Sequence, residues 1–303
     1  MRIIFMGTPD FAVQSLAKLV ESGCEVVAVI TATDKAAGRG KKLRPSPVKQ
    51  YALEKNIPVL QPKNLKANSF LEELKSYKAD LQVVVAFRML PAVVFEMPPL
   101  GTFNLHASLL PQYRGAAPIN WAVINGETET GATTFFIEQQ IDTGLIIFQE
   151  KTSIAPNMTA GELHDRLMIQ GADLVLKTVK AIELGEYPQV AQATTSNLKN
   201  APKIFKEDCK IDWQKPMDEV HNFIRGLSPY PAAFTIIKDK RFKIFKTTKI
   251  PLFAAGNSGE WETDDESFLH FHTTDGLIAI EELQMEGKKR MNIKDFLRGY
   301  NLN

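Results

Sequence analysis

Residues 2–31 read RIIFMGTPDFAVQSLAKLVESGCEVVAVIT, and this stretch predicts the fold of the first half of the chain. The apolar run at residues 2–6 is typical of a short buried strand. Residues 10–22 repeat apolar side chains at helical spacing, which predicts an amphipathic helix. Residues 25–31 are rich in β-branched side chains, which favour a second strand. One strand, one helix and a second strand in this order indicate a βαβ unit.

The same alternation continues toward the middle of the chain. We predict strands at residues 59–60, 81–86, 101–106 and 133–138, and helices at residues 48–55, 69–77 and 160–184. The run LQVVVA at residues 81–86 has no polar alternation after Gln82, as expected for a strand covered on both faces. The pattern predicts an α/β fold with a Rossmann-like, mostly parallel sheet and helices on both faces.

The last third of the chain has a different pattern. After residue 184 the periodicity is lost, and we interpret residues 189–205 as a linker. A helix is predicted at residues 218–227, followed by short strands at residues 233–237, 241–245, 267–272 and 276–282. This density of short strands predicts a small β-barrel. The expected domains are therefore residues 1–188 and 206–303.

Composition excludes several classes of protein. The chain has 303 residues, a net charge of +1 and two cysteines, so we expect no disulfide framework and only a local nucleic-acid surface. Its first apolar run is too short for a signal peptide, and no stretch reaches the roughly 18 apolar residues of a membrane helix. We expect a cytoplasmic monomer without a membrane segment.

Asn104 and His106 are the first candidates for chemistry. They are two positions apart on a predicted strand, so their side chains project from the same face. They also lie at the carboxyl end of that strand, where open α/β sheets place their sites. Asp142 follows in a turn before Gly144, and the fold could bring it back to His106.

The whole run around these residues resembles the signature of the folate-dependent formyltransferase family. That signature reads Asn-x-His-x-Ser-Leu-Leu-Pro, then Arg-Gly, then Asp-x-Gly; here it becomes NLHASLLPQYRG and IDTG. The resemblance implies that Asn104, His106 and Asp142 are catalytic and that 10-formyltetrahydrofolate is the co-substrate. Formyl transfer needs a donor for the oxyanion and a group that moves the amine proton. An amide, an imidazole held charged by a carboxylate, and that carboxylate suit these tasks without a metal.

The resemblance also implies where the folate binds. One segment follows the buried strand, and the other continues the catalytic run; together they contain Phe87, Arg88, Met89, Leu90, Ser108, Leu109, Leu110 and Pro111. Phe87 and Arg88 depart from the Ala-Tyr-Gly that begins the first segment in many relatives. Ser108 has no evident base beside it, so we do not expect it to be a nucleophile.

A basic segment indicates the acceptor. Residues 34–49 carry six basic side chains against one acid, directly after the second predicted strand. A charged segment is usually just solvated, but here it suits a phosphate backbone that approaches the site. It resembles the inserted loop of family members that formylate methionyl initiator tRNA, which implies this partner and Arg39 as its main contact. Lys41 and Lys42 would be supporting contacts.

The C-terminal third resembles the family's open barrel of oligonucleotide-binding type. Two groups of basic residues there could either face tRNA or simply be solvated: Lys238, Lys240, Arg241, Lys243, Lys246 and Lys249, and then Lys288, Lys289 and Arg290.

Other functions remain open at this point. A formyltransferase for an amino-sugar nucleotide, or a formyl-folate hydrolase or dehydrogenase module, would share the same trio, although the basic segment speaks against them. A non-catalytic RNA-binding relative is a further alternative, and the intact trio of Asn104, His106 and Asp142 speaks against it. A nicotinamide-dependent oxidoreductase fails for want of G-x-G-x-x-G, and the turn at residues 5–11 suits an ordinary helix start.

Overall fold

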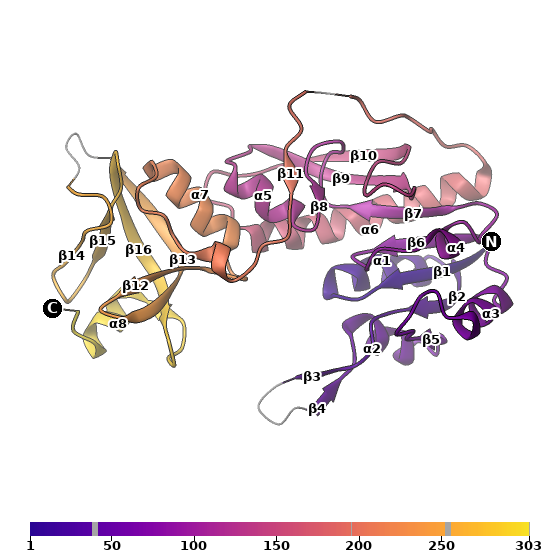
Figure 1. Cartoon of the computed structure of the whole chain (residues 1–303), viewed down its shortest axis with the longest axis horizontal. Coiled ribbons are helices and arrows are strands. Elements are labelled where there is room, and N and C mark those ends of the chain that lie inside the picture. The colour runs from indigo at the N-terminus through magenta and orange to yellow at the C-terminus, as the bar shows by residue number, and fades with distance from the viewer. Residues whose placement is uncertain (38–41, 195, 252–255, 303) are drawn as a thin grey trace. The chain divides into compact units, whose positions relative to one another are not determined.

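The computed structural model describes residues 1–37, 42–194, 196–251 and 256–302 (Figure 1). It divides into two compact units. The first contains Met1–Gly115, Gly131–Thr152 and His164–Asn200, and the second contains Ala116–Thr130, Ser153–Leu163 and Ala201–Asn303.

The first unit is built on a seven-stranded sheet. Its strand order is β10-β9-β7-β6-β1-β2-β5. The strands are β1 (Arg2–Gly7), β2 (Glu25–Ile30), β5 (Val59–Leu60), β6 (Leu81–Val85), β7 (Thr102–His106), β9 (Glu129–Phe136) and β10 (Ile146–Ser153). The pairs from β5 to β7 are parallel, whereas β7 and β9 are antiparallel. The predicted mostly parallel sheet is therefore confirmed.

Helices cover this sheet because its strands are apolar on both faces. All five residues of β6 are buried, as its uninterrupted apolar run predicts. Ile4 and Met6 pack in a cluster with apolar residues of α3 and α4, while Ile3 and Phe5 are buried on the opposite face of the same strand. The helices are α1 (Asp10–Glu21), α2 (Pro47–Glu54), α3 (Asn68–Ser76), α4 (Ala92–Phe95) and α6 (Ala160–Leu184).

The second unit contains the antiparallel sheet that the density of short strands predicts. Its order is β12-β13-β16-β15-β14, with β17 paired to β16, and every one of these pairs is antiparallel. The elements are α5 (Pro118–Ile124), α7 (Met217–Leu227), β12 (Ala233–Ile237), β13 (Lys240–Pro251), β14 (Trp261–Thr263), β15 (Leu269–His272), β16 (Gly276–Met285), β17 (Met291–Asn292) and α8 (Ile293–Gly299). Apolar side chains of α7 and α8 pack in one core with those of this open, curled sheet.

Several elements were not predicted from the sequence. A hairpin of β3 (Lys35–Ala37) and β4 (Lys42–Arg44) forms within the basic segment. β8 (Arg114–Gly115) pairs with β11 (Asn200–Ala201), and β13 extends six residues beyond the predicted end at residue 245. These strands are short, polar or half-exposed, so they carry little hydrophobic period. Among the helices of the described residues, none has the length and apolar character needed to cross a membrane.

Candidate active site

Strand β7 presents the first two candidate residues. It lies between β6 and β9, where Asn104 pairs with Val84 and His106 pairs with Thr133. His106 is buried, whereas Asn104 is half-buried. Within the described part of the chain, the Asn104 side chain makes no hydrogen bond. Its amide therefore remains available as a donor on the same face as the imidazole.

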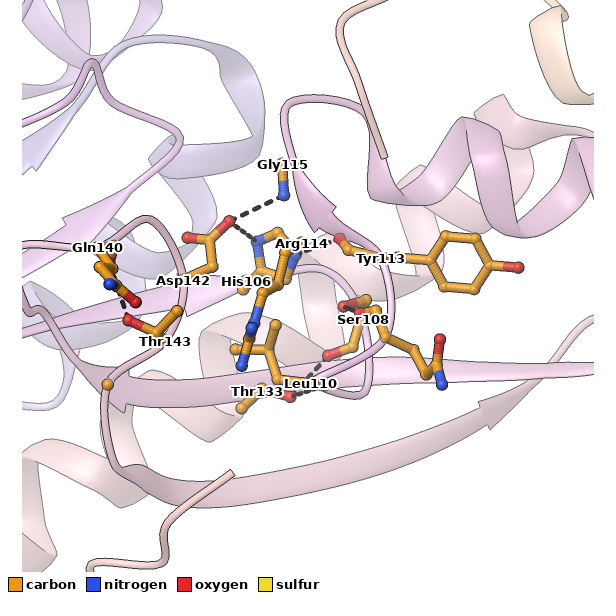
Figure 2. A network of polar contacts seen from close by, with 12 residues as sticks. His106, Ser108, Leu110, Tyr113, Arg114, Gly115, Thr133, Gln140, Asp142 and Thr143 are labelled. Carbon is orange, nitrogen blue, oxygen red and sulfur yellow. Dashed lines mark hydrogen bonds and ion pairs between the residues drawn. The ribbon is translucent and has the colours of Figure 1, made fainter. Parts of the chain in front are cut away.

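The two nitrogens of His106 have different surroundings (Figure 2). Nε2 lies 2.8 Å from the backbone oxygen of Tyr113. Because a carbonyl oxygen only accepts, Nε2 must carry a proton and donate it. Nδ1 instead faces the carboxylate of Asp142, with 3.8 Å between Nδ1 and Oδ2. The hydrogen bond from Nε2 to Tyr113 fixes the ring and leaves Nδ1 as the nitrogen able to take part in proton transfer.

Backbone contacts at Gly115 and Gly144 hold Asp142 and the turn around it. Its own φ is +54°, in the left-handed region that suits a tight turn. The backbone N–H of Gly115 donates to Oδ2 at 2.9 Å. At Gly144 an added Cβ would lie 1.7 Å from the carbonyl oxygen of Phe136, so only glycine allows this close approach. The fold thus brings Asp142 back to His106, about 36 positions earlier in the sequence.

A buried hydroxyl network holds the loop that follows β7. The Ser108 hydroxyl donates to the backbone oxygen of Gln112 at 2.6 Å. The Thr133 hydroxyl donates to the Ser108 backbone oxygen at 2.6 Å and accepts from the Leu110 N–H at 3.2 Å. Ser108 is fully buried, so its hydroxyl serves the loop. Neither Thr133 nor Tyr113 was predicted, because Thr133 lies on another strand and Tyr113 acts through its backbone.

The predicted folate segment after β6 is an exposed turn. Ala86 has a φ of +48° and begins it. The Arg88 guanidinium donates to the backbone oxygens of Pro62 and Lys63, so this side chain anchors the turn. Phe87 is half-buried, Leu90 is buried and Met89 is 70% exposed. Backbone groups and apolar surface are therefore what this turn offers to a ligand.

A cavity of about 530 Å³ lies beside the opposite end of β7. Its walls come from the end of α4, the start of β7 and the segment after β9: Phe95, Glu96, Pro98, Pro99, Gly101, Thr102, Phe136, Ile137, Glu138 and Gln139. Neither the catalytic candidates nor the predicted folate residues line it. The last lining residue in sequence, Gln139, lies three positions before Asp142.

The basic segment is only partly described. Arg39 and Lys41 lie outside the described residues, as does the side chain of Lys42. Lys49 is not free, because its ammonium lies 2.8 Å from Asp34 Oδ2 and donates to Gln61 at 2.7 Å. Hydrogen bonds from Lys49 and then Gln61 lower the pKa of the Asp34 carboxyl. This cluster joins the two ends of the segment and removes Lys49 as a phosphate contact.

Ion pairs also occupy part of the C-terminal basic groups. Lys246 lies 2.8 Å from Glu281, and Arg290 lies 2.5 Å from Glu282. Lys249 pairs in the same way with Asp218. No group of three or more His, Cys, Asp or Glu side chains among the described residues is arranged to hold a metal ion.

Comparison with known proteins places this site in context. The sequence pattern described as "Formyl transferase" matches residues 1–179, and "Formyl transferase, C-terminal domain" matches residues 203–301. The chain is 54% identical to the methionyl-tRNA formyltransferase of Bacteroides thetaiotaomicron over 310 aligned positions, which cover 100% of this chain and 96% of that protein. It is 52% identical to the enzyme of the same name from Flavobacterium johnsoniae, with 99% and 96% covered.

A solved structure with the same fold carries ligands. It is the N-formyltransferase from Helicobacter canadensis in complex with folinic acid and dTDP-3-aminofucose. The TM-score is 0.70 at 26% identity, with 95% of this chain and 99% of that chain covered.

Proposed function

The chain belongs to the formyl transferase family, and from this premise we propose that it transfers the formyl group of 10-formyltetrahydrofolate to the amino group of methionyl initiator tRNA. The product is formylmethionyl-tRNA, which is used to initiate translation. The observation that carries this function is the identity of 54% over the full chain to a methionyl-tRNA formyltransferase. The enzyme acts as a monomer in the cytoplasm, where charged tRNA and folate are both available.

Three side chains divide the chemistry among them. The methionyl amine attacks the formyl carbon, a new N–C bond forms, and the bond from that carbon to the folate nitrogen breaks. The Asn104 amide donates to the oxyanion that develops on the formyl oxygen. The pair formed by His106 Nδ1 and Asp142, 3.8 Å apart, takes the proton of the amine and returns it to the leaving folate nitrogen.

The folate lies against the exposed turn after β6. Met89, in this turn, and Ile141, beside Asp142, are 70% and 57% exposed, so their apolar side chains are accessible to a ligand. They and the half-buried Phe87 offer apolar contacts to a pterin ring, while backbone groups of the turn read its amide edge. Leu109, Leu110 and Pro111 border the formyl carbon. Folinic acid in the solved Helicobacter canadensis relative supports a folate at this fold's site.

The basic segment receives the acceptor arm of the tRNA. Arg39 is the main contact, with Lys41 and Lys42 beside it. The hairpin of β3 and β4, which pairs Lys35 with Arg44, forms within this segment. The amino-sugar acceptor of the Helicobacter canadensis relative belongs to a chain only 26% identical, so it weighs less than the full-length relatives.

The test is transfer of radiolabelled formyl from 10-formyltetrahydrofolate to a panel of acceptors. Methionyl initiator tRNA, methionyl elongator tRNA and dTDP-amino sugars are assayed in parallel with the full chain. We expect strong labelling of the initiator tRNA alone. Labelling of an amino sugar in its place would keep the family and overturn the acceptor.

A further inference from the structure

The segment between the two matched regions contacts the site directly. Val190 exchanges two backbone hydrogen bonds with Ile146, at 2.8 and 2.9 Å. Further along, the Lys199 backbone oxygen accepts from the Tyr113 N–H at 2.6 Å. Val190 and Lys199 therefore fix this segment against the two loops that contact His106 and contain Asp142. Gln192 lies between these two anchored points and is half-buried.

The Gln192 side chain joins the two catalytic loops. Its Oε1 accepts from Nε and Nη2 of Arg114, at 3.1 and 2.6 Å. Its Nε2 donates to the backbone oxygens of Asp142 and Gly144, at 2.8 and 2.9 Å. One amide thus uses both of its ends, and all four contacts are of hydrogen-bond length.

The loop that carries Arg114 contacts both His106 and Asp142. Gly115, next to Arg114, donates its N–H to the Asp142 carboxylate at 2.9 Å. Tyr113, on the other side of Arg114, accepts from the His106 ring at 2.8 Å. A movement of either loop would therefore change the distance between His106 and Asp142.

The backbone conformation of Asp142 depends on its contacts, so their loss favours such a movement. A φ of +54° at a residue other than glycine persists only where its surroundings hold it. The Gln192 amide satisfies the Asp142 carbonyl and the Gly144 carbonyl on both sides of this residue. Without it, the turn can relax away from His106.

We infer that Gln192 is a positioning residue for the formyl transfer: it holds the Asp142 turn and the Arg114 loop in register so that Asp142 faces His106 Nδ1. This rests on the role proposed for Asp142. Because a displacement of about 1 Å at a reacting group can reduce turnover by about 100-fold, the loss of this contact acts on kcat. The tRNA is bound by residues outside this turn, so its KM changes little. Ile141 supplies only one of several apolar contacts to folate, so the KM for folate changes less than kcat.

Three variants separate this role from a structural one. Gln192→Ala removes all four contacts. Gln192→Glu keeps the acceptor for Arg114 but has no N–H for the carbonyls of Asp142 and Gly144. Gln112→Ala is the matched control, since the Gln112 side chain ties Asn197 and Lys199 to the loop that carries Arg114 and has no hydrogen bond to the Asp142 turn among the described residues.

The measurements are kcat, both KM values, and hydrogen–deuterium exchange of the peptide 139–146 in the full chain. We expect kcat to fall about 10- to 100-fold in both Gln192 variants, with faster exchange of that peptide, and Gln112→Ala to match the wild type within about twofold. Wild-type kinetics for Gln192→Glu, unchanged exchange in Gln192→Ala, or an equal effect of Gln112→Ala would overturn the inference. The exchange measurement does not depend on activity, so it tests the positioning role of Gln192 by itself. A wild-type chain that does not formylate initiator tRNA would refute the proposed function separately.

Discussion

Replacing Asp142 by Asn removes the charge beside His106 and changes almost nothing else. The side chains have the same shape, and the remaining oxygen still accepts the Gly115 N–H that Oδ2 accepts at 2.9 Å. A hydrogen bond to a charged acceptor exceeds a neutral one by about 1 kcal/mol, so the loss of stability should be of that size. The fold is therefore expected to survive the change.

The effect on turnover follows from the distance of 3.8 Å between His106 Nδ1 and Asp142 Oδ2. At an effective dielectric constant of about 20, a charged pair at this distance attracts by about 4 kcal/mol. If that attraction develops as the imidazole takes the proton, its loss reduces kcat by about 1,000-fold. This lies within the range of about 100- to 10,000-fold that general acid–base groups contribute.

The assay is steady-state formylation of methionyl initiator tRNA, together with urea unfolding of the same preparations. We expect KM for tRNA within about threefold of the wild type, because Asp142 contributes to the reaction and not to the phosphate contacts. Gln140→Ala, a change in the same turn, is the control for local disturbance. A folded Asp142→Asn enzyme that keeps more than about one-tenth of kcat would refute the proton-transfer role.

Three further changes test other parts of the structure. Arg39→Ala should raise KM for initiator tRNA about tenfold and leave KM for folate unchanged; equal losses would refute its role as a phosphate contact. Asp34→Asn leaves the Lys49 ammonium without its counter-ion and should lower the midpoint of urea unfolding; a midpoint equal to that of the wild type would contradict the cluster. Burial first, and then the charges of neighbouring cations, lower the pKa of His221 to about 4 from an ordinary value near 6.5. The unfolded chain then binds the proton first, so the stability that His221 contributes is fully present above pH 6.5 and is lost as pH falls toward 4, by about 3 kcal/mol in total. His221→Gln should flatten this part of the pH dependence of unfolding, and an unchanged slope would count against the buried neutral ring.

The sequence predicts those parts of the fold that carry a hydrophobic period. Residues 2–31 specify β1, α1 and β2 closely, because each element must bury one or two apolar faces. β14 lies in an acidic stretch and was missed, because its pairing with β15 gives no signal in its own residues. The β3–β4 hairpin of the basic segment was missed for the same reason, since its backbone pairing does not depend on apolar side chains.

The candidate site divides in a similar way. Asn104 and His106 are predictable as a pair because two positions on a strand fix their common face. The approach of Asp142 to His106 depends on a turn that no spacing specifies. Gln192 escaped prediction altogether, because it lies in a polar segment without periodicity and acts through the backbone oxygens of other residues. Lys49 was counted among the six basic residues of its segment, and its pairing with Asp34 is visible only in three dimensions.

The most direct test of the transferase is a single-turnover experiment that measures both products at once. Enzyme in excess is mixed with 10-formyltetrahydrofolate and methionyl initiator tRNA, and tetrahydrofolate and formylmethionyl-tRNA are followed over the same time course. We expect the two products to appear at the same rate and in equal amounts, and Asp142→Asn to slow both together. Tetrahydrofolate that forms with free formate and without formylmethionyl-tRNA would show hydrolysis and refute the proposed transfer.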